Sequence, residues 1–223
     1  MSCYKRFSTP IWQLPNSEEP TEALDWALRL KDKYPSRTIS NRGGYQSPSF
    51  HIDEFKYAKH VRAGISCIFP YYLIQNWWVN INMKGDYNLS HSHPNTDIAA
   101  IWYLTDNHGK LILEDPCIHT RFNLYEFFEK KGVKDHNKSV NVTAKAGEIV
   151  MFPADVRHFV EPHDSDSPRV CVSMNLTLIS EEEWISMKKM DERIEKMENK
   201  ELQKEIRDAS LTDPQNSAIF TKS

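Results

Sequence analysis

Apolar and polar residues follow three different spacings along this 223-residue chain. Between residues 20 and 34 apolar side chains recur every three or four positions, which predicts a helix that Pro35 closes. Residues 65–178 instead contain short runs of β-branched and aromatic residues, and turn residues separate these runs. Helical spacing returns at residues 180–208. The pattern therefore predicts a β-rich core between two helices.

The central segment predicts many strands close together in sequence. The predicted strands cover residues 77–83, 98–104, 110–113, 140–144, 148–152 and 169–178. Such spacing is typical of a jelly-roll sandwich or barrel and not of a parallel βαβ sheet. A short helix is expected around residues 124–131, and residues 51–64 give no firm signal. We predict a single, mainly β domain over residues 1–223, with its core at residues 65–178.

The C-terminal helix has a readable start. Ser180 followed by Glu183 has the form of a capping box, in which the two side chains bond to each other's backbone amides. Apolar residues then mark one side of the helix among many Lys and Glu residues. We expect this helix to cover the outside of the barrel. The alternative is a helix that forms a homodimer.

The composition of the chain argues against nucleic acid and membranes as partners and does not identify another partner. The net charge is −3, so nothing indicates attraction to nucleic acid or to an anionic membrane. No segment is long and apolar enough to span a bilayer, and the N-terminal residues lack the features of a signal peptide. The four cysteines are scattered and are expected to be free thiols. These features predict a cytoplasmic protein.

Two histidines stand close together in the segment NLSHSHP at residues 88–94. On an extended segment, His91 and His93 project to the same side and could offer two adjacent positions to one metal ion. The pattern is short and common, and a pair of surface histidines in a polar turn is the alternative.

A second segment favours the metal site over a pair of surface histidines. The glycine turn and apolar strand of GEIVMFP, at residues 147–153, are followed by His158. In an antiparallel barrel this strand can lie beside the one that carries the first pair. His91, His93 and His158 could then occupy one face of an octahedron and leave three positions open for a bidentate co-substrate and dioxygen.

A third segment, RVCVSMNL at residues 169–176, alternates strictly between polar and apolar residues. Arg169, Ser173 and Asn175 share one face, which could line a cavity for an anion, because a guanidinium group pairs with a carboxylate in two-point geometry. The alternative is a polar face toward solvent. Residues 77–83 show the same mixed pattern, with Trp78 and two asparagines opposite apolar side chains.

Taken together, these segments resemble the Fe(II)/2-oxoglutarate-dependent oxygenases, in particular a group from bacteria and phages. The resemblance runs from residue 78 to residue 175. It rests on the segments WVNINxKGDYNxxHxHP, IWYL, GKLxLEDP, GExVMFPxxxxHxVxP and RVxxSxN, in that order. The resemblance implies a double-stranded β-helix, a form of jelly roll, and an enzyme that uses Fe(II), 2-oxoglutarate and O2.

The resemblance also implies roles for single residues. His91 and His158 match the two histidine ligands of the family's iron, and His93 is the expected third ligand. Arg169 resembles the basic residue that holds the distal carboxylate of 2-oxoglutarate, with Ser173 beside it. Tyr103 is similar to a tyrosine that often helps to hold this co-substrate. By analogy, the substrate is a prolyl residue, another amino acid or a small metabolite, which would be hydroxylated with release of succinate and CO2.

The chain departs from the family pattern at two places. The wider superfamily usually has a carboxylate two residues after the first histidine, where this chain has His93. Either the site has three histidines or a carboxylate reaches it from elsewhere, and Asp97 is the nearest candidate. Related sequences also tend to have Ser-Gly where this chain has Ala99 and Ala100.

Two other functions fit part of the pattern. One is a cupin-like metal protein, which would have no need for Arg169. The other is a ligand-binding barrel without turnover, which the unusual His93 favours. Trp102, Phe152 and Phe159 are candidates for shielding the site, although each is more often a core residue. The remaining histidines, His51, His60, His108, His119, His136 and His163, are expected to be solvated.

Overall fold

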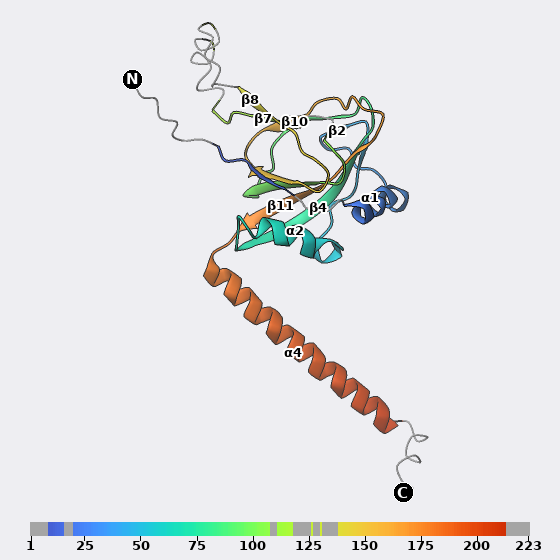
Figure 1. Ribbon diagram of the computed structural model, residues 1–223. Helices are drawn as coiled ribbons and strands as arrows, with labels where there is room; N and C mark the ends of the chain where they lie inside the picture. Colours follow the sequence, from blue (N-terminus) through green and yellow to red (C-terminus); the bar gives the residue numbers. More distant parts are fainter. Residues whose placement is uncertain are drawn as a thin grey trace. The chain divides into compact units, whose positions relative to one another are not determined.

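We describe the protein from a computed structural model, which defines residues 9–15, 20–107, 111–117, 126, 130 and 138–212 (Figure 1). The chain forms two compact units, one up to Leu178 and one from Ile179 onward. The first unit carries both sheets and the first two α-helices. The prediction of a single domain over residues 1–223 stays a prediction.

The first unit contains two antiparallel sheets. The larger sheet has the order β1 (Trp12–Leu14), β9 (Ile149–Pro153), β6 (Ile98–Tyr103), β11 (Arg169–Leu178), β4 (Tyr72–Asn82) and β3 (Tyr45–Gln46). The smaller sheet has the order β2 (Asn41–Arg42), β5 (Tyr87–His91), β10 (His158–Val160), β7 (Leu111–Glu114) and β8 (Ser139–Val142). Strands distant in sequence are neighbours in both sheets, as in the predicted jelly roll.

Helices cover the outer face of the larger sheet (Figure 1). The helices α1 (Thr21–Lys33) and α2 (Ala58–Ile65) bury apolar side chains against β4, β6 and β11. Trp77 lies at the centre of this layer, with its ring centroid 4.8 Å from that of Phe55. The outward residues of β11, such as Val172 and Met174, are fully buried here. The same strand therefore turns its polar residues inward, toward the smaller sheet.

The sequence-based strand boundaries are largely confirmed. The last predicted strand matches β11 residue for residue, whereas β4 begins at Tyr72, five positions before the predicted strand. The region at residues 51–64, which gave no signal, contains the 3-10 helix η1 (Ile52–Glu54) and most of α2. The helix α2 has eight residues and buries only Val61 and Ile65, too few for a readable period. The helix expected at residues 124–131 falls almost wholly outside the described residues.

The second unit consists, where it is described, of the helix α4 (Glu181–Thr212). Its predicted capping box is present. The Ser180 amide donates to Glu183 Oε2 over 2.8 Å, and the Glu183 amide donates to Ser180 Oγ over 3.2 Å. That α4 covers the barrel or forms a dimer stays a prediction. Among the described residues, no helix is both long and apolar enough to cross a membrane.

Candidate metal centre and ligand cavity

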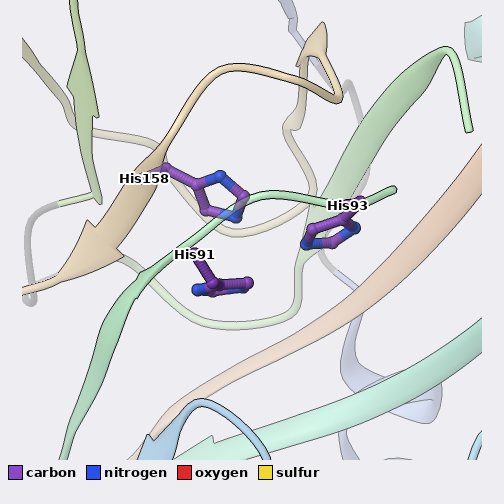
Figure 2. Close-up of side chains that lie close together, drawn as sticks. All are labelled: His91, His93 and His158. Carbon is purple, nitrogen blue, oxygen red and sulfur yellow. The ribbon is translucent and has the colours of Figure 1, made fainter. Parts of the chain in front are cut away.

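Three histidines converge between the two neighbouring strands β5 and β10 (Figure 2). His91 ends β5 and His158 begins β10, and the two residues are direct partners in the antiparallel ladder. His93 follows two residues after β5, where its amide donates to the Ala154 carbonyl over 2.9 Å. One potential ligand atom from each ring lies within 4.8 Å of the other two. The predicted convergence of the three imidazoles is therefore present in the structure.

The hydrogen bonds of these rings define which nitrogen can bind a metal. Each Nδ1 faces an oxygen acceptor: the Leu89 carbonyl at 2.7 Å for His91, Asn175 Oδ1 at 2.6 Å for His93, and the Val156 carbonyl at 2.9 Å for His158. A carbonyl oxygen only accepts, so each Nδ1 carries the hydrogen. Each Nε2 then keeps a free lone pair, as a metal ligand requires. The donor set fits one first-row divalent ion such as Fe(II).

Burial keeps the three imidazoles neutral. It lowers the pKa of His158 to about 3, with a further lowering by His91. Burial also lowers the pKa of His91 and of His93, although the hydrogen bonds to Leu89 and Asn175 oppose the shift. Protons compete with a metal ion for imidazole nitrogens. These rings are therefore ready to bind a metal at neutral pH without first losing a proton.

Asp97, the alternative third ligand, is engaged elsewhere. Its side chain is exposed, and its Oδ2 accepts a hydrogen bond from the Leu178 amide over 2.8 Å. Within the described part of the chain, the group that could hold a metal ion consists of the three histidines alone. The geometry thus favours a three-histidine site over one completed by Asp97.

A cavity of about 280 Å³ opens beside the three histidines. Its walls come from both sheets, and β11 contributes four residues of its inward face: Arg169, Cys171, Ser173 and Asn175. Trp78 and Asn80 of β4 line the neighbouring wall. The polar faces predicted for these two strands therefore face a cavity, and the alternative of a solvent-facing side is wrong.

Arg169 is a buried cation that two asparagine side chains hold in place. Its side chain is 2% exposed, and its guanidinium group donates from Nε to Asn107 Oδ1 over 2.8 Å and from Nη1 to Asn82 Oδ1 over 3.1 Å. Among the described residues, no Asp or Glu forms an ion pair with it. These two partners are neutral amides, which position the group without adding a negative charge. A buried charge of this kind suits an anionic ligand.

Burial lowers the pKa of Arg169, but Cys171 and Tyr103 raise it more, so the net shift is upward and the group stays charged. The ring of Tyr103 lies 5.3 Å from the guanidinium carbon, and burial raises the pKa of Tyr103 to about 12. Tyr103 is not among the residues that line the cavity. The structure places it against Arg169, and its predicted contact with the co-substrate stays a prediction.

Ser173 lies in the wall of the same cavity, four positions after Arg169 on β11. Its hydroxyl oxygen accepts a hydrogen bond from Asn80 Nδ2 over 3.0 Å. The hydroxyl hydrogen can then be donated to a ligand. The predicted contact of Ser173 with the co-substrate stays a prediction.

Two expectations about other residues are wrong. Trp102 does not shield the site, because its side chain lies in the outer core, with its ring centroid 5.1 Å from that of His60 in α2. His163 is not solvated but 1% exposed, and its Nε2 lies 2.6 Å from the Ser167 carbonyl oxygen. Phe152 does line the cavity, with its ring 4.8 Å from that of His158. His51 and His60 are exposed as expected, whereas the predictions for His108, His119 and His136 fall outside the described residues.

Sequence reasoning missed the residues that hold the site in place. Asn82 and Asn107 bind the guanidinium group of Arg169, and Asn175 binds His93. The alternation of β4 and β11 placed two of them on the inward faces but did not show their partners. Asn107 lies between the predicted strands at residues 98–104 and 110–113, where turn residues such as asparagine are common, so the sequence carried no signal for its role.

Comparisons with known proteins agree with this geometry. Residues 76–175 match the model of a family described as "Putative 2OG-Fe(II) oxygenase". No curated protein matches the sequence. Among solved structures, the non-heme alpha ketoglutarate dependent epimerase SnoN from nogalamycin biosynthesis is 14% identical, with a TM-score of 0.57 over 76% of this chain and 78% of that chain.

Two further structures are similar to a comparable degree. The non-heme alpha ketoglutarate dependent carbocyclase SnoK from nogalamycin biosynthesis is 15% identical, with a TM-score of 0.54 over 76% of this chain and 80% of that chain. HygX from Streptomyces hygroscopicus, solved with nickel and 2-oxoglutarate bound, is 11% identical, with a TM-score of 0.51 over 76% of this chain and 83% of that chain. At these identities the likeness concerns the fold.

Proposed function

Because this chain belongs, through residues 76–175, to the 2OG-Fe(II) oxygenase family, we propose that it hydroxylates a small-molecule or peptidyl substrate. Fe(II) is the metal of that family and 2-oxoglutarate its co-substrate. We assign the iron to His91, His93 and His158, and the distal carboxylate of 2-oxoglutarate to Arg169. The balanced reaction converts the substrate C–H, 2-oxoglutarate and O2 into the C–OH product, succinate and CO2.

The observation that carries the proposal is the presence of two complementary groups in one cavity. The three histidines offer neutral nitrogen lone pairs, and Arg169 offers a buried positive charge with no acidic partner among the described residues. A ligand that contacts both groups needs a metal-chelating end and an anionic end. 2-Oxoglutarate has a 2-oxo acid at one end and a carboxylate at the other. A simple metal-binding barrel would not need the second group.

The protein residues would position the reactants and exclude water. Arg169 would hold the distal carboxylate by charge-assisted hydrogen bonds, and the Ser173 hydroxyl would add a third. Phe152 packs beside His158, which limits access of water to that side of the centre. When bound, the iron supplies the oxidative chemistry, and the protein supplies orientation and a shielded cavity.

Anaerobic addition of Fe(II) and 2-oxoglutarate tests this assignment directly. We expect a weak visible charge-transfer band in the wild-type protein that disappears in His158→Ala and persists in His51→Ala. His51 is a suitable control because its side chain is exposed and pairs with Asp53. Succinate release with a panel of peptides and metabolites should likewise be present in the wild-type protein and in His51→Ala and absent in His158→Ala. A wild-type protein without the band, or a band of equal intensity in His158→Ala, would contradict the proposal.

A further inference from the structure

The strand β5 has an irregularity directly before His91. In the ladder between β5 and β10, one residue separates the paired positions His158 and Val160 of β10, whereas two residues, Leu89 and Ser90, separate their partners on β5. Two residues opposite one form a β-bulge. Such bulges bend a strand and change the direction of nearby side chains, and they are frequent beside active sites.

Both residues of the bulge direct their backbone carbonyl groups at side-chain donors. The Leu89 carbonyl oxygen lies 2.7 Å from His91 Nδ1, and the Ser90 carbonyl accepts a hydrogen bond from Arg157 Nη2 over 3.3 Å. The first contact places the hydrogen of the His91 ring on Nδ1 and leaves the lone pair of Nε2 for a metal. The orientation and the tautomer of His91 therefore depend on where the bulge holds the Leu89 carbonyl.

Three polar side chains hold this bulge, and we call them the Ser90 cluster: Ser90, Glu114 and Arg157. Ser90 Oγ donates to Glu114 Oε2 over 2.6 Å and accepts from Arg157 Nη2 over 3.2 Å. Arg157 Nε lies 3.6 Å from Glu114 Oε2, and the Glu114 amide donates to the Arg157 carbonyl over 2.8 Å. None of the three side chains is among those that line the cavity. The cluster thus joins β5 and β7 to the residue before β10 without contacting the ligand space.

The cluster lies at the two positions where it can affect the metal centre most. Ser90 directly precedes His91, and Arg157 directly precedes His158, and these two histidines are ladder partners (Figure 2). The strand β10 has only three residues, and its ladder with β5 is irregular beside the histidines. A metal centre needs its ligands within about 0.5 Å of their working positions. Side-chain links across the bulge supply a constraint that a short, irregular ladder lacks.

A contribution to overall stability does not explain the cluster. The side chains of Arg157 and Glu114 are 58% and 31% exposed, and ion pairs with such access to solvent contribute little to the free energy of unfolding. The hydrogen bonds of Ser90 instead act on one segment of backbone. Their expected effect is local, on the residue that follows the bulge.

We propose that Ser90, Glu114 and Arg157 are positioning residues of the metal centre. They hold the β5 bulge so that the Leu89 carbonyl keeps the His91 ring in one tautomer, with Nε2 free for the metal. The inference rests on the proposed function, because it takes His91 and His158 as ligands of the iron.

Long-range 1H–15N NMR of the metal-free full chain at pH 7.5 tests the local effect, because it shows which ring nitrogen of each histidine carries the hydrogen. Comparison with His91→Gln identifies the His91 signals. We expect the hydrogen of His91 on Nδ1 in the wild-type protein and a mixture of both tautomers in Ser90→Ala. His93 is the internal control, because its acceptor is Asn175 on β11 and its tautomer should not change.

Anaerobic equilibrium dialysis with Fe(II) tests the consequence for the metal. Ser90→Ala and Glu114→Leu should each weaken binding about fivefold, the effect expected from the loss of hydrogen bonds at one ligand. Glu114→Gln keeps an acceptor oxygen for the Ser90 hydroxyl and should retain most of the affinity. Lys84→Met is the control, because it breaks an exposed ion pair, that of Lys84 with Asp166 at 2.9 Å, and should leave both measurements unchanged.

Three results would overturn the inference. The first is a His91 tautomer in Ser90→Ala that equals that of the wild-type protein, and the second is wild-type Fe(II) affinity in that variant. The third is a change of the His93 tautomer as large as that of His91, because the cluster would then support the fold in general and not one ligand.

The outcomes also separate this inference from the function on which it rests. A wild-type protein that binds Fe(II) with an affinity equal to that of Ser90→Ala would refute the positioning role and leave the proposed function intact. A wild-type protein that does not bind Fe(II) would refute both, whatever tautomer the metal-free His91 adopts.

Discussion

His93 and Asn175 are joined by a hydrogen bond of 2.6 Å from the ring Nδ1 to the amide oxygen. Asn175 is fixed in turn, because its Nδ2 donates to Asn76 Oδ1 over 3.0 Å. The strand β11 thus orients the third histidine of the centre and also carries Arg169 at its other end. One strand therefore orients His93, which we assign to iron, and carries Arg169, which we assign to 2-oxoglutarate.

We expect Asn175→Leu to weaken Fe(II) binding about 10- to 100-fold, the usual effect of removing the partner that orients a histidine ligand. The substitution removes the acceptor for His93 Nδ1, so the ring loses both its fixed orientation and its tautomer. Asn175→Asp keeps the acceptor and should retain most of the affinity. Equilibrium dialysis with Fe(II) under anaerobic conditions measures both. An unchanged affinity in Asn175→Leu would show that His93 is not a ligand or needs no support.

Arg169→Ala should raise the dissociation constant of 2-oxoglutarate about 10- to 100-fold, because hydrogen bonds to charged groups contribute about 1.5–3 kcal/mol. Fe(II) binding without co-substrate should change little. Arg169→Lys keeps the charge but loses the two-point geometry. Its dissociation constant for 2-oxoglutarate should therefore lie between that of the wild-type protein and that of Arg169→Ala. Titration of the charge-transfer band with 2-oxoglutarate gives these constants. Equal co-substrate affinity in Arg169→Ala and the wild-type protein would disprove the assignment.

Asn107→Leu tests whether the amides around Arg169 position it. The substitution removes the acceptor at Nε but keeps the charge and the contact with Asn82. Because a single hydrogen bond contributes about 0.5–1.5 kcal/mol, we expect 2-oxoglutarate affinity to fall about 2- to 12-fold, which is less than in Arg169→Ala. A loss as large as that of Arg169→Ala, measured by the same titration, would mean that Asn107 itself contacts the co-substrate or that the site has collapsed.

The sequence predicted the fold best where its periodicity was longest. The strict alternation over residues 169–178 predicted both the bounds of β11 and the inward face that lines the cavity. Short elements gave too few residues for a period. The three-residue strand β10 carries His158 but could not be recognised as a strand, and α2 was missed for the same reason.

The sequence also pointed to the three histidines as candidate metal ligands and to Arg169 as a candidate anion-binding residue, because few residue types can bind a metal ion or a carboxylate in these ways. It did not predict the amides that hold them. An asparagine serves equally in turns, on surfaces and in buried networks, so its type does not identify its partner. The role of Asn107 depends on a contact across 62 positions of the chain, which local pattern cannot show.

The buried His158 should make the metal-free protein sensitive to acid. Its pKa is lowered to about 3, whereas the unfolded chain takes up the proton near 6.5. The unfolded state therefore binds more protons below pH 6.5, and the free energy of unfolding falls as pH drops from about 6.5 toward 3. At pH 5 the expected loss from His158 is about 2 kcal/mol.

Urea unfolding at pH 7.5 and pH 5.0 in the presence of a chelator measures this loss. His158→Gln cannot take up the proton and should show a smaller difference between the two pH values. His91 and His93 have pKa values shifted in the same direction, so part of the acid sensitivity should remain in that variant. An equal difference in the wild-type protein and His158→Gln would contradict the assigned shift.

Anaerobic Fe(II) binding to the wild-type protein and to four single variants tests the central claim most directly. We predict one Fe(II) per chain in the wild-type protein and in Asp97→Asn, because the Asp97 carboxylate is bonded to the Leu178 amide. His91→Ala, His93→Ala and His158→Ala should each lose at least about tenfold in affinity, since each removes one of three ligands. Wild-type affinity in any of the three histidine variants, or loss of binding in Asp97→Asn, would contradict the three-histidine centre.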